Sequence, residues 1–96
     1  MKSTPVDLAA KLAAEMPDLT ANEISILNYL YEYRKATVAR LAKDLDLGQS
    51  EVRRALAMLG PDVGIGMVEF DSPDAALADR ARLGVAGITF LEILAG

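Results

Sequence analysis

The chain has 96 residues, enough for one domain with a modest core, and its apolar fraction of 52% excludes an intrinsically disordered protein. It contains no cysteine and no histidine, which excludes disulfides, thiolate or imidazole metal sites, and catalysis by a cysteine nucleophile or a histidine base. The net charge of −4 counts against a nucleic-acid-binding protein, because neutralisation of phosphate charge supplies much of the affinity for DNA. No apolar run is long enough to span a bilayer, and the first residues lack the apolar core of a signal peptide. We therefore expect a cytoplasmic protein without a membrane partner.

A first helix is predicted within residues 1–17. Pro5 suits the first position of a helix, and Pro17 disfavours helical geometry in the residue before it. Leu8, Leu12 and Met16 recur at helical spacing and form one apolar stripe. Such a stripe can fold back onto the chain's own core or pack against a second subunit, and we favour the second subunit.

Residues 20–60 are predicted to form a three-helix region. Its first helix begins after Thr20, because Thr20 and Glu23 have the spacing of a capping box. This helix runs to about residue 34, and its inward side chains are expected to be Ile24, Leu27, Leu30 and Tyr31. Residues 34–36 are interpreted as a link to Thr37, which caps the next helix.

Two short helices joined by a tight break are predicted over residues 37–59. Apolar residues at helical spacing give each helix one buried stripe, and Leu47 and Gly48 interrupt the pattern between them. This arrangement is a helix-turn-helix. The second helix keeps four side chains with hydrogen-bond donors off its buried stripe, namely Gln49, Ser50, Arg53 and Arg54. Donors of this kind reach base edges and phosphates in DNA.

The pattern T-x-x-x-L-A-x-x-L-x-L-x-Q-S-x-V-x-x-A-L-x-x-L over residues 37–59 resembles the helix-turn-helix of winged-helix transcription regulators, broadly the MarR-like and ArsR-like groups. The likeness extends to residues 19–30 and to residues 82–92. It implies a mainly α fold with a small β-hairpin, namely a winged helix-turn-helix with an extra helix at each end. It also implies binding of double-stranded DNA, with Thr37 among the DNA-facing residues.

Two residues depart from the pattern of these regulators. Gly48 stands where the family often has serine, and glycine offers no side-chain oxygen to cap the helix. Glu51 stands where relatives commonly carry a neutral residue close to DNA. A carboxylate at that position either accepts a hydrogen bond from a cytosine amino group or repels phosphate, and we expect repulsion.

Residues 64–84 are predicted to form the wing. Residues 67–70 alternate in polarity as in a half-buried strand, and residues 71–74 are typical of a turn. In the returning strand, Arg80 and Arg82 alternate with apolar residues, so both arginines should point outward. On a wing they could contact the minor groove or flanking phosphates.

A second interpretation of this region stays open. Pro73 could begin a helix that Gly84 ends, and residues 85–94 would then be a strand in a β-α-β unit. We prefer the wing because residues 82–92 match the family pattern, although a helical turn within residues 73–78 fits either interpretation.

Residues 85–96 are predicted to form a C-terminal helix that is apolar on nearly every side. One apolar face suffices for a small core, so the surplus indicates a surface that a partner covers. We therefore predict a homodimer in which the first helix of one subunit meets the last helix of the other. The expected interface consists of Leu8, Leu12, Met16, Ile88, Leu91 and Leu94.

No motif of an enzyme or of a cofactor site is present, and Gly64 and Gly66 do not make a phosphate-binding loop. Two functions remain. The preferred one is a dimeric DNA-binding transcription regulator that reads the major groove with residues 49–59. The alternative is a winged-helix module for protein–protein interaction, which the acidic charge, Glu51 and the apolar last helix favour.

Overall fold

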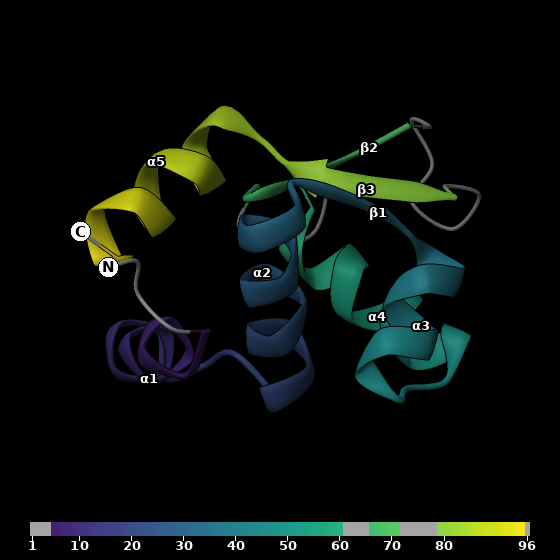
Figure 1. The fold of residues 1–96 in the computed structure, drawn as a ribbon, viewed down its shortest axis with the longest axis horizontal. Coiled ribbons are helices and arrows are strands. Elements are labelled where there is room, and N and C mark those ends of the chain that lie inside the picture. The colour runs from purple at the N-terminus through teal and green to yellow at the C-terminus, as the bar shows by residue number, and fades with distance from the viewer. Residues whose placement is uncertain (1–4, 61–65, 72–78, 96) are drawn as a thin grey trace.

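The computed structural model describes residues 5–60, 66–71 and 79–95 (Figure 1). In chain order these residues form α1 (Pro5–Glu15), α2 (Ala21–Tyr33), β1 (Lys35–Thr37), α3 (Val38–Leu45), α4 (Gln49–Leu59), β2 (Val68–Phe70), β3 (Arg80–Leu83) and α5 (Val85–Ala95). The fold is mainly α-helical with a small antiparallel sheet, which confirms the predicted fold class. Residues 72–78, where the turn and a possible helix were predicted, lie outside the described residues.

Helix α2 stands at the centre of the molecule, with α1 and α5 on one side and α3 and α4 on the other (Figure 1). It begins with the predicted capping box: Thr20 Oγ1 accepts from the Glu23 N–H at 3.2 Å, and Glu23 Oε1 accepts from the Thr20 N–H at 3.0 Å. Ile26, Leu27 and Leu30 are fully buried, whereas Ile24 is only half-buried. The helix is therefore rotated slightly from the orientation predicted for it, because core neighbours on both sides contact it.

Helices α1 and α5 contact one another within the same chain, and α1 also contacts α2. Leu8, Leu12 and Leu91 are almost completely buried there, and Met16, Ile88 and Leu94 pack partly buried against the same core. The structure thus places the stripe of α1 on the chain's own core, and not on a second subunit as expected. The physical reason is that α1 packs against both α2 and α5, so its leucines are covered by apolar side chains of the same chain.

The three strands form one sheet in the order β1-β3-β2, with both pairs antiparallel. Strand β1 was missed by the sequence interpretation, which placed a link at residues 34–36. The rival β-α-β interpretation is wrong over its described part, since residues 80–83 are a strand and residues 85–95 are a helix. Strand β3 has both arginines exposed and Ala81 and Leu83 buried, as predicted for a half-buried strand.

A single cluster of buried side chains joins the helices and the inner face of the sheet. In the stripes predicted for the helix-turn-helix, Ala42 and Leu45 are only partly buried, whereas the others are buried, namely Val38, Leu41, Val52, Leu56 and Leu59. Gly87 lets α5 lie against the chain entering β2, since a Cβ there would clash with the backbone carbonyl of Met67. This close approach fixes the N-terminus of α5 beside the end of the sheet.

Candidate nucleic-acid interface

A three-residue break joins α3 to α4. Helix α3 ends in Asp46, whose backbone is left-handed (φ 57°, ψ 48°), a conformation that Asp tolerates better than most residues. The Leu47 N–H then donates to the Ala42 carbonyl at 2.9 Å, which closes the turn, and the Leu47 side chain packs against the core. The break thereby holds α4 at a fixed orientation against α3, which contacts it.

Helix α4 buries one face and presents the other to solvent. Val52, Ala55, Leu56 and Leu59 are buried, while Gln49, Ser50 and Arg54 are exposed and the Arg53 side chain is 33% exposed. Gln49 and Arg53 are four residues apart, as are Ser50 and Arg54, so the four predicted DNA-contacting residues lie on the outward side of this helix. Amide, hydroxyl and guanidinium groups together can bond to both base edges and phosphates.

Glu51 has a role that the sequence interpretation did not find. Its Oε1 accepts a hydrogen bond from the Gly48 N–H at 2.9 Å, at the N-terminus of α4. The carboxylate therefore satisfies one of the unpaired donors of the first turn and lies near the positive end of the helix dipole. The signal was present in the sequence, because a glutamate three residues after the N-cap is half of a capping box even when the cap residue is Gly48.

Three of the predicted residues meet where β1 and β3 pair beside α3 and α4. Thr37 lies opposite Arg80 in the β1–β3 register, and its Oγ1 caps α3 by accepting from the Arg40 N–H at 3.0 Å. Arg53 of α4 approaches Asp79 at 3.9 Å, just before Arg80. This junction brings residues from the helix-turn-helix and the wing strand to one place, although Asp79 partly offsets its positive charge.

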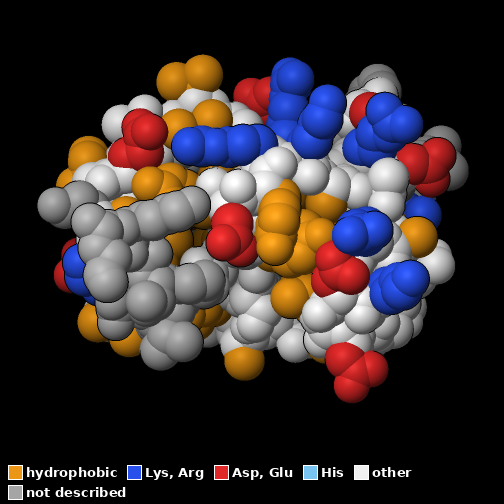
Figure 2. Space-filling model, viewed as in Figure 1, with side chains coloured by type: hydrophobic (Ala, Val, Ile, Leu, Met, Phe, Trp, Pro, Cys, Tyr) orange, Lys and Arg blue, Asp and Glu red, His pale blue; other side chains and the backbone are white. Residues whose placement is uncertain are grey.

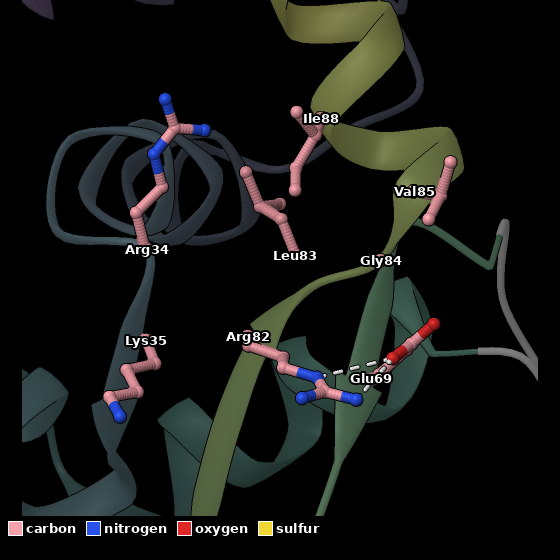
Figure 3. A pocket seen from close by; sticks show the side chains of 8 residues that line it. All are labelled: Arg34, Lys35, Glu69, Arg82, Leu83, Gly84, Val85 and Ile88. Carbon is pink, nitrogen blue, oxygen red and sulfur yellow. Dashed lines mark hydrogen bonds and ion pairs between the residues drawn. The ribbon is translucent and has the colours of Figure 1, made fainter.

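Arg82 lies apart from that junction. Its Nε and Nη2 both donate to Glu69 Oε1, at 3.2 and 3.0 Å, and it lies opposite Lys35 on the other side (Figure 3). Arg82 is two residues from Arg80, and a strand advances by about 3.3 Å per residue. The two predicted wing arginines therefore lie about 7 Å apart on the same face of β3, with different cross-strand neighbours.

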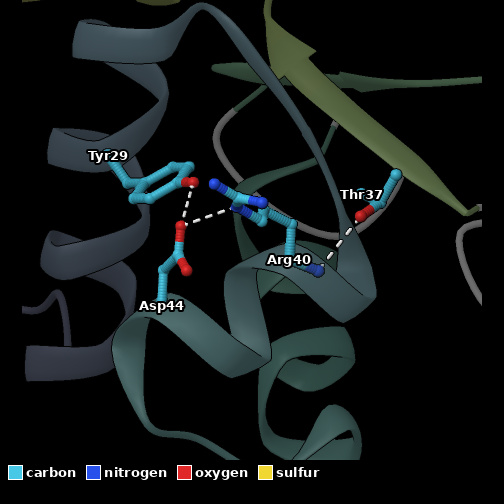
Figure 4. Close-up of polar contacts among 4 residues, drawn as sticks. All are labelled: Tyr29, Thr37, Arg40 and Asp44. Carbon is cyan, nitrogen blue, oxygen red and sulfur yellow. Dashed lines mark hydrogen bonds and ion pairs between the residues drawn. The ribbon is translucent and has the colours of Figure 1, made fainter.

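A polar network ties α2 to α3 close to the junction (Figure 4). The Tyr29 hydroxyl donates to Asp44 Oδ2 at 2.6 Å, and Arg40 Nε donates to the same oxygen at 2.9 Å. The bond from Tyr29, with the nearby charge of Arg40, lowers the pKa of Asp44, while the bond to Asp44 raises the pKa of Tyr29. The Tyr29 hydroxyl thus holds the Asp44 carboxylate beside Arg40.

Lys and Arg side chains gather along the edge of the molecule formed by the sheet, with Asp and Glu between them (Figure 2). The cations there and on α3 and α4 are Arg34, Lys35, Arg40, Lys43, Arg53, Arg54, Arg80 and Arg82. Four of the carboxylates near them are already bonded, in the pairs Arg40–Asp44, Arg53–Asp79 and Arg82–Glu69 and in the cap of α4. In the described part of the chain, no ion pair forms with Arg54 or Arg80.

Comparison of the chain with protein-family models, with curated proteins and with solved structures found no match. No helix within residues 5–60, 66–71 and 79–95 is long and apolar enough to cross a membrane. The same residues contain no group of three acidic side chains arranged to hold a metal ion.

Proposed function

We propose that this protein is a winged-helix DNA-binding regulator that inserts α4 into the major groove. The observation that carries the proposal is the outward face of α4, where Gln49, Ser50 and Arg54 are exposed and Arg53 is half-exposed. All four side chains have hydrogen-bond donors, and a short turn holds their helix against α3. A helix presented in this way has the dimensions and chemistry to enter the major groove.

The order of the elements supports the same proposal. The succession α2, β1, α3, α4, β2, β3 is that of a winged helix, and the antiparallel β2–β3 pair corresponds to the wing. The resemblance of residues 37–59 to MarR-like and ArsR-like regulators points in the same direction. Because one fold can carry several functions, the DNA-contacting role rests on the side chains of α4 and not on the topology alone.

We assign the phosphate contacts of the wing to Arg80 and Thr37 and not to Arg82. Arg80 lies opposite Thr37 and close to Arg53, so one DNA backbone could contact all three. Arg82 already donates two hydrogen bonds to Glu69, and breaking them would cost part of any gain from DNA.

The proposal is tested by titrating the protein against a mixture of random-sequence duplexes at low and moderate salt. Binding should weaken as salt rises, because phosphate contacts release counterions. Arg54→Glu should weaken binding strongly, and Lys11→Glu, the same charge change at an exposed position on α1, should weaken it far less. Glu51→Gln should tighten binding, because it removes a negative charge from the end of α4. If neither the wild type nor Glu51→Gln binds at low salt, the regulator function is excluded.

The proposed regulator is a homodimer, and the packing of α1 changes where its interface should be. Val85 and Ile93 of α5 are 79% and 72% exposed, and Thr89 lies midway between them on the same helical face. An antiparallel pair of α5 helices with its two-fold axis at Thr89 would bring Val85 against Ile93 of the partner subunit. Sedimentation at micromolar concentration tests this, and Ile93→Asp should shift the protein toward a monomer.

A module for protein–protein interaction is the second candidate, and the same exposed face of α5 favours it. The net charge of −4 also fits a protein partner better than it fits DNA. Absence of DNA binding, together with a monomer in sedimentation, would leave this function as the one to pursue.

A further inference from the structure

Two positive side chains lie directly opposite each other on neighbouring strands, at the end of the sheet close to α5. Lys35 of β1 is the register partner of Arg82 of β3, so their side chains leave the sheet on the same face. Like charges in this position destabilise a sheet, because their Cβ atoms are only about 5 Å apart. Glu69 compensates Arg82 from the β2 side, whereas Lys35 forms no ion pair with any residue in the described ranges.

A third cation stands beside this pair in an unfavourable backbone conformation. Arg34 ends α2 with φ 72° and ψ −37°, and its N–H donates to the Leu30 carbonyl at 2.7 Å. Glycine adopts a positive φ without steric cost, whereas arginine does not. The Arg34 guanidinium lies 5.2 Å from the centroid of the Tyr31 ring. It forms no ion pair with a carboxylate among the described residues.

These cations border a pocket of about 320 Å³ whose opposite wall is aliphatic (Figure 3). Leu83 and Gly84 also line it, Val85 and Ile88 line it from the first turn of α5, and Glu69 is the one carboxylate among its described lining residues. Val85 is among the most exposed large apolar side chains of the described residues, so it gains the most from being covered. The first turn of α5 adds partial positive charge, because its N–H groups have no acceptor within the helix. The first bond of that helix runs from the Ile88 N–H to the Gly84 carbonyl.

We propose that this pocket binds a small carboxylate with a branched aliphatic body. The carboxylate binds Lys35 and Nη1 of Arg82, which is not one of the two nitrogens that donate to Glu69, so the Arg82–Glu69 pair is kept. Arg34 can swing from Tyr31 to reach the same carboxylate. The aliphatic body covers Val85 and Ile88. A pocket of this size suits a ligand of a few to about ten heavy atoms and is too small for a folded partner. This site does not depend on whether the protein binds DNA, because it involves neither the outward face of α4 nor Arg80. It shares Val85 with the proposed α5–α5 interface, so the ligand and the second subunit compete for that side chain.

Titration with 4-methylpentanoate, followed by amide chemical shifts, tests the proposal. The shifts of Gly84, Val85 and Ile88 should move together and saturate, with a Kd on the order of 1 mM. Acetate has the same charge without the aliphatic body, and 4-methylpentanamide has the body without the charge, so both should bind at least several-fold more weakly. Shifts that never saturate, that spread over the exposed cations of the whole chain, or that are equal for acetate would overturn the proposal.

Variants separate binding from folding at this site. Lys35→Glu should abolish binding while raising the melting temperature, because it replaces a like-charge pair with an opposite-charge pair across the strands. Lys35→Gln should weaken binding about tenfold, the usual effect of losing one charged hydrogen bond. Val85→Ser should weaken 4-methylpentanoate but not acetate. Lys11→Glu is the matched control, and a loss of binding there as large as in Lys35→Glu would show that only the net charge matters, which contradicts the site.

Discussion

The carboxylate of Glu51 accepts a hydrogen bond from the backbone N–H of Gly48, with Oε1 2.9 Å from the nitrogen. Gly48 is the N-cap residue of α4 and has no side chain with which to bond the first turn. Glu51 is thus the only side chain shown to satisfy a donor at this end of α4 among the described residues. The residue with the least favourable charge for DNA binding is therefore also the one that begins the helix proposed to enter the groove.

Removing this cap should destabilise the protein by a small, measurable amount. Glu51→Ala should lower the free energy of unfolding by about 1 kcal/mol, because a first-turn N–H loses its partner. Glu51→Gln keeps a side-chain oxygen and should cost only about 0.5 kcal/mol, the usual effect of one charge near a helix N-terminus. Chemical denaturation measures both values. Glu92→Ala, an exposed glutamate within α5, is the control, and an equal loss there would show that the cap contributes nothing.

The packing of α1 leads to a prediction about the isolated chain. Leu12 is fully buried against the chain's own core, so Leu12→Ala should lower the free energy of unfolding by about 2–5 kcal/mol. Ala13→Ser, at an exposed position of the same helix, should change it by less than about 0.5 kcal/mol. The loss should be the same at low and high protein concentration. A loss that appears only at concentrations where the protein self-associates would place Leu12 in an interface between subunits.

Local patterns predicted much of this fold from sequence. The Thr20–Glu23 capping box, the buried stripes of α3 and α4 and the outward arginines of β3 all depend on residues within a few positions of one another. Strand β1 could not be found in the same way. It has only three residues, and it becomes a strand because Ala36 pairs with Ala81, which is far away in the sequence.

In the candidate site, too, features that depend on local patterns were predictable, and features that depend on long-range pairing were not. The face of α4 followed from helical periodicity, so Gln49, Ser50 and Arg54 were placed correctly on the outside. The pairing of Arg82 with Glu69 depends on strand register, and the position of Leu12 depends on where the chain folds back. An apolar stripe shows that a helix face is buried, but it contains no information on whether the same chain or another covers it.

The Tyr29–Asp44 bond should make stability depend on pH in two ranges. The folded protein lowers the pKa of Asp44, so this contribution is present above the ordinary Asp pKa and is lost as the pH falls through the folded value. The folded protein raises the pKa of Tyr29, so the contribution is also lost as the pH rises through that value, above about 10. The stability difference between wild type and Tyr29→Phe should therefore be largest near neutral pH and shrink at both extremes.

The carboxyl resonance of Asp44 provides an independent measurement of this bond. In Tyr29→Phe the ring contact with Tyr33 can persist, because only the hydroxyl is removed. The pKa of Asp44 should rise toward its ordinary value but stay below it, since Arg40 still donates to the carboxylate at 2.9 Å. An identical pKa for Asp44 in the two proteins would contradict the assigned hydrogen bond.

The positive φ of Arg34 predicts that a substitution to glycine does not destabilise the protein, unlike most substitutions. Arg34→Gly should raise the free energy of unfolding or leave it unchanged, with a gain of up to about 1 kcal/mol, because glycine adopts a positive φ without strain. The gain is reduced by loss of the contact with the Tyr31 ring. Arg34→Ala loses that contact and keeps the strain, so it should be less stable than both other forms. Thermal melts of the three proteins decide this, and a Gly variant less stable than the Ala variant would show that φ is not strained.

Arg80 and Arg82 should differ in their effect on DNA binding, although they are two residues apart on the same exposed face of β3. Arg80 lies opposite Thr37 at the junction with α3 and α4, whereas Arg82 lies opposite Lys35 and donates to Glu69. If the junction contacts the DNA backbone, Arg80→Gln should reduce the slope of log Kd against log salt by about 1, the effect of losing one phosphate contact. Arg82→Gln should leave that slope nearly unchanged, and because it carries the same loss of charge it controls for the overall field. Titration of the same duplexes at several salt concentrations gives both slopes.

Equal reductions of the slope by Arg80→Gln and Arg82→Gln would mean that net charge governs binding. A reduction by Arg82→Gln alone would move the DNA contact to the α5 end of the sheet.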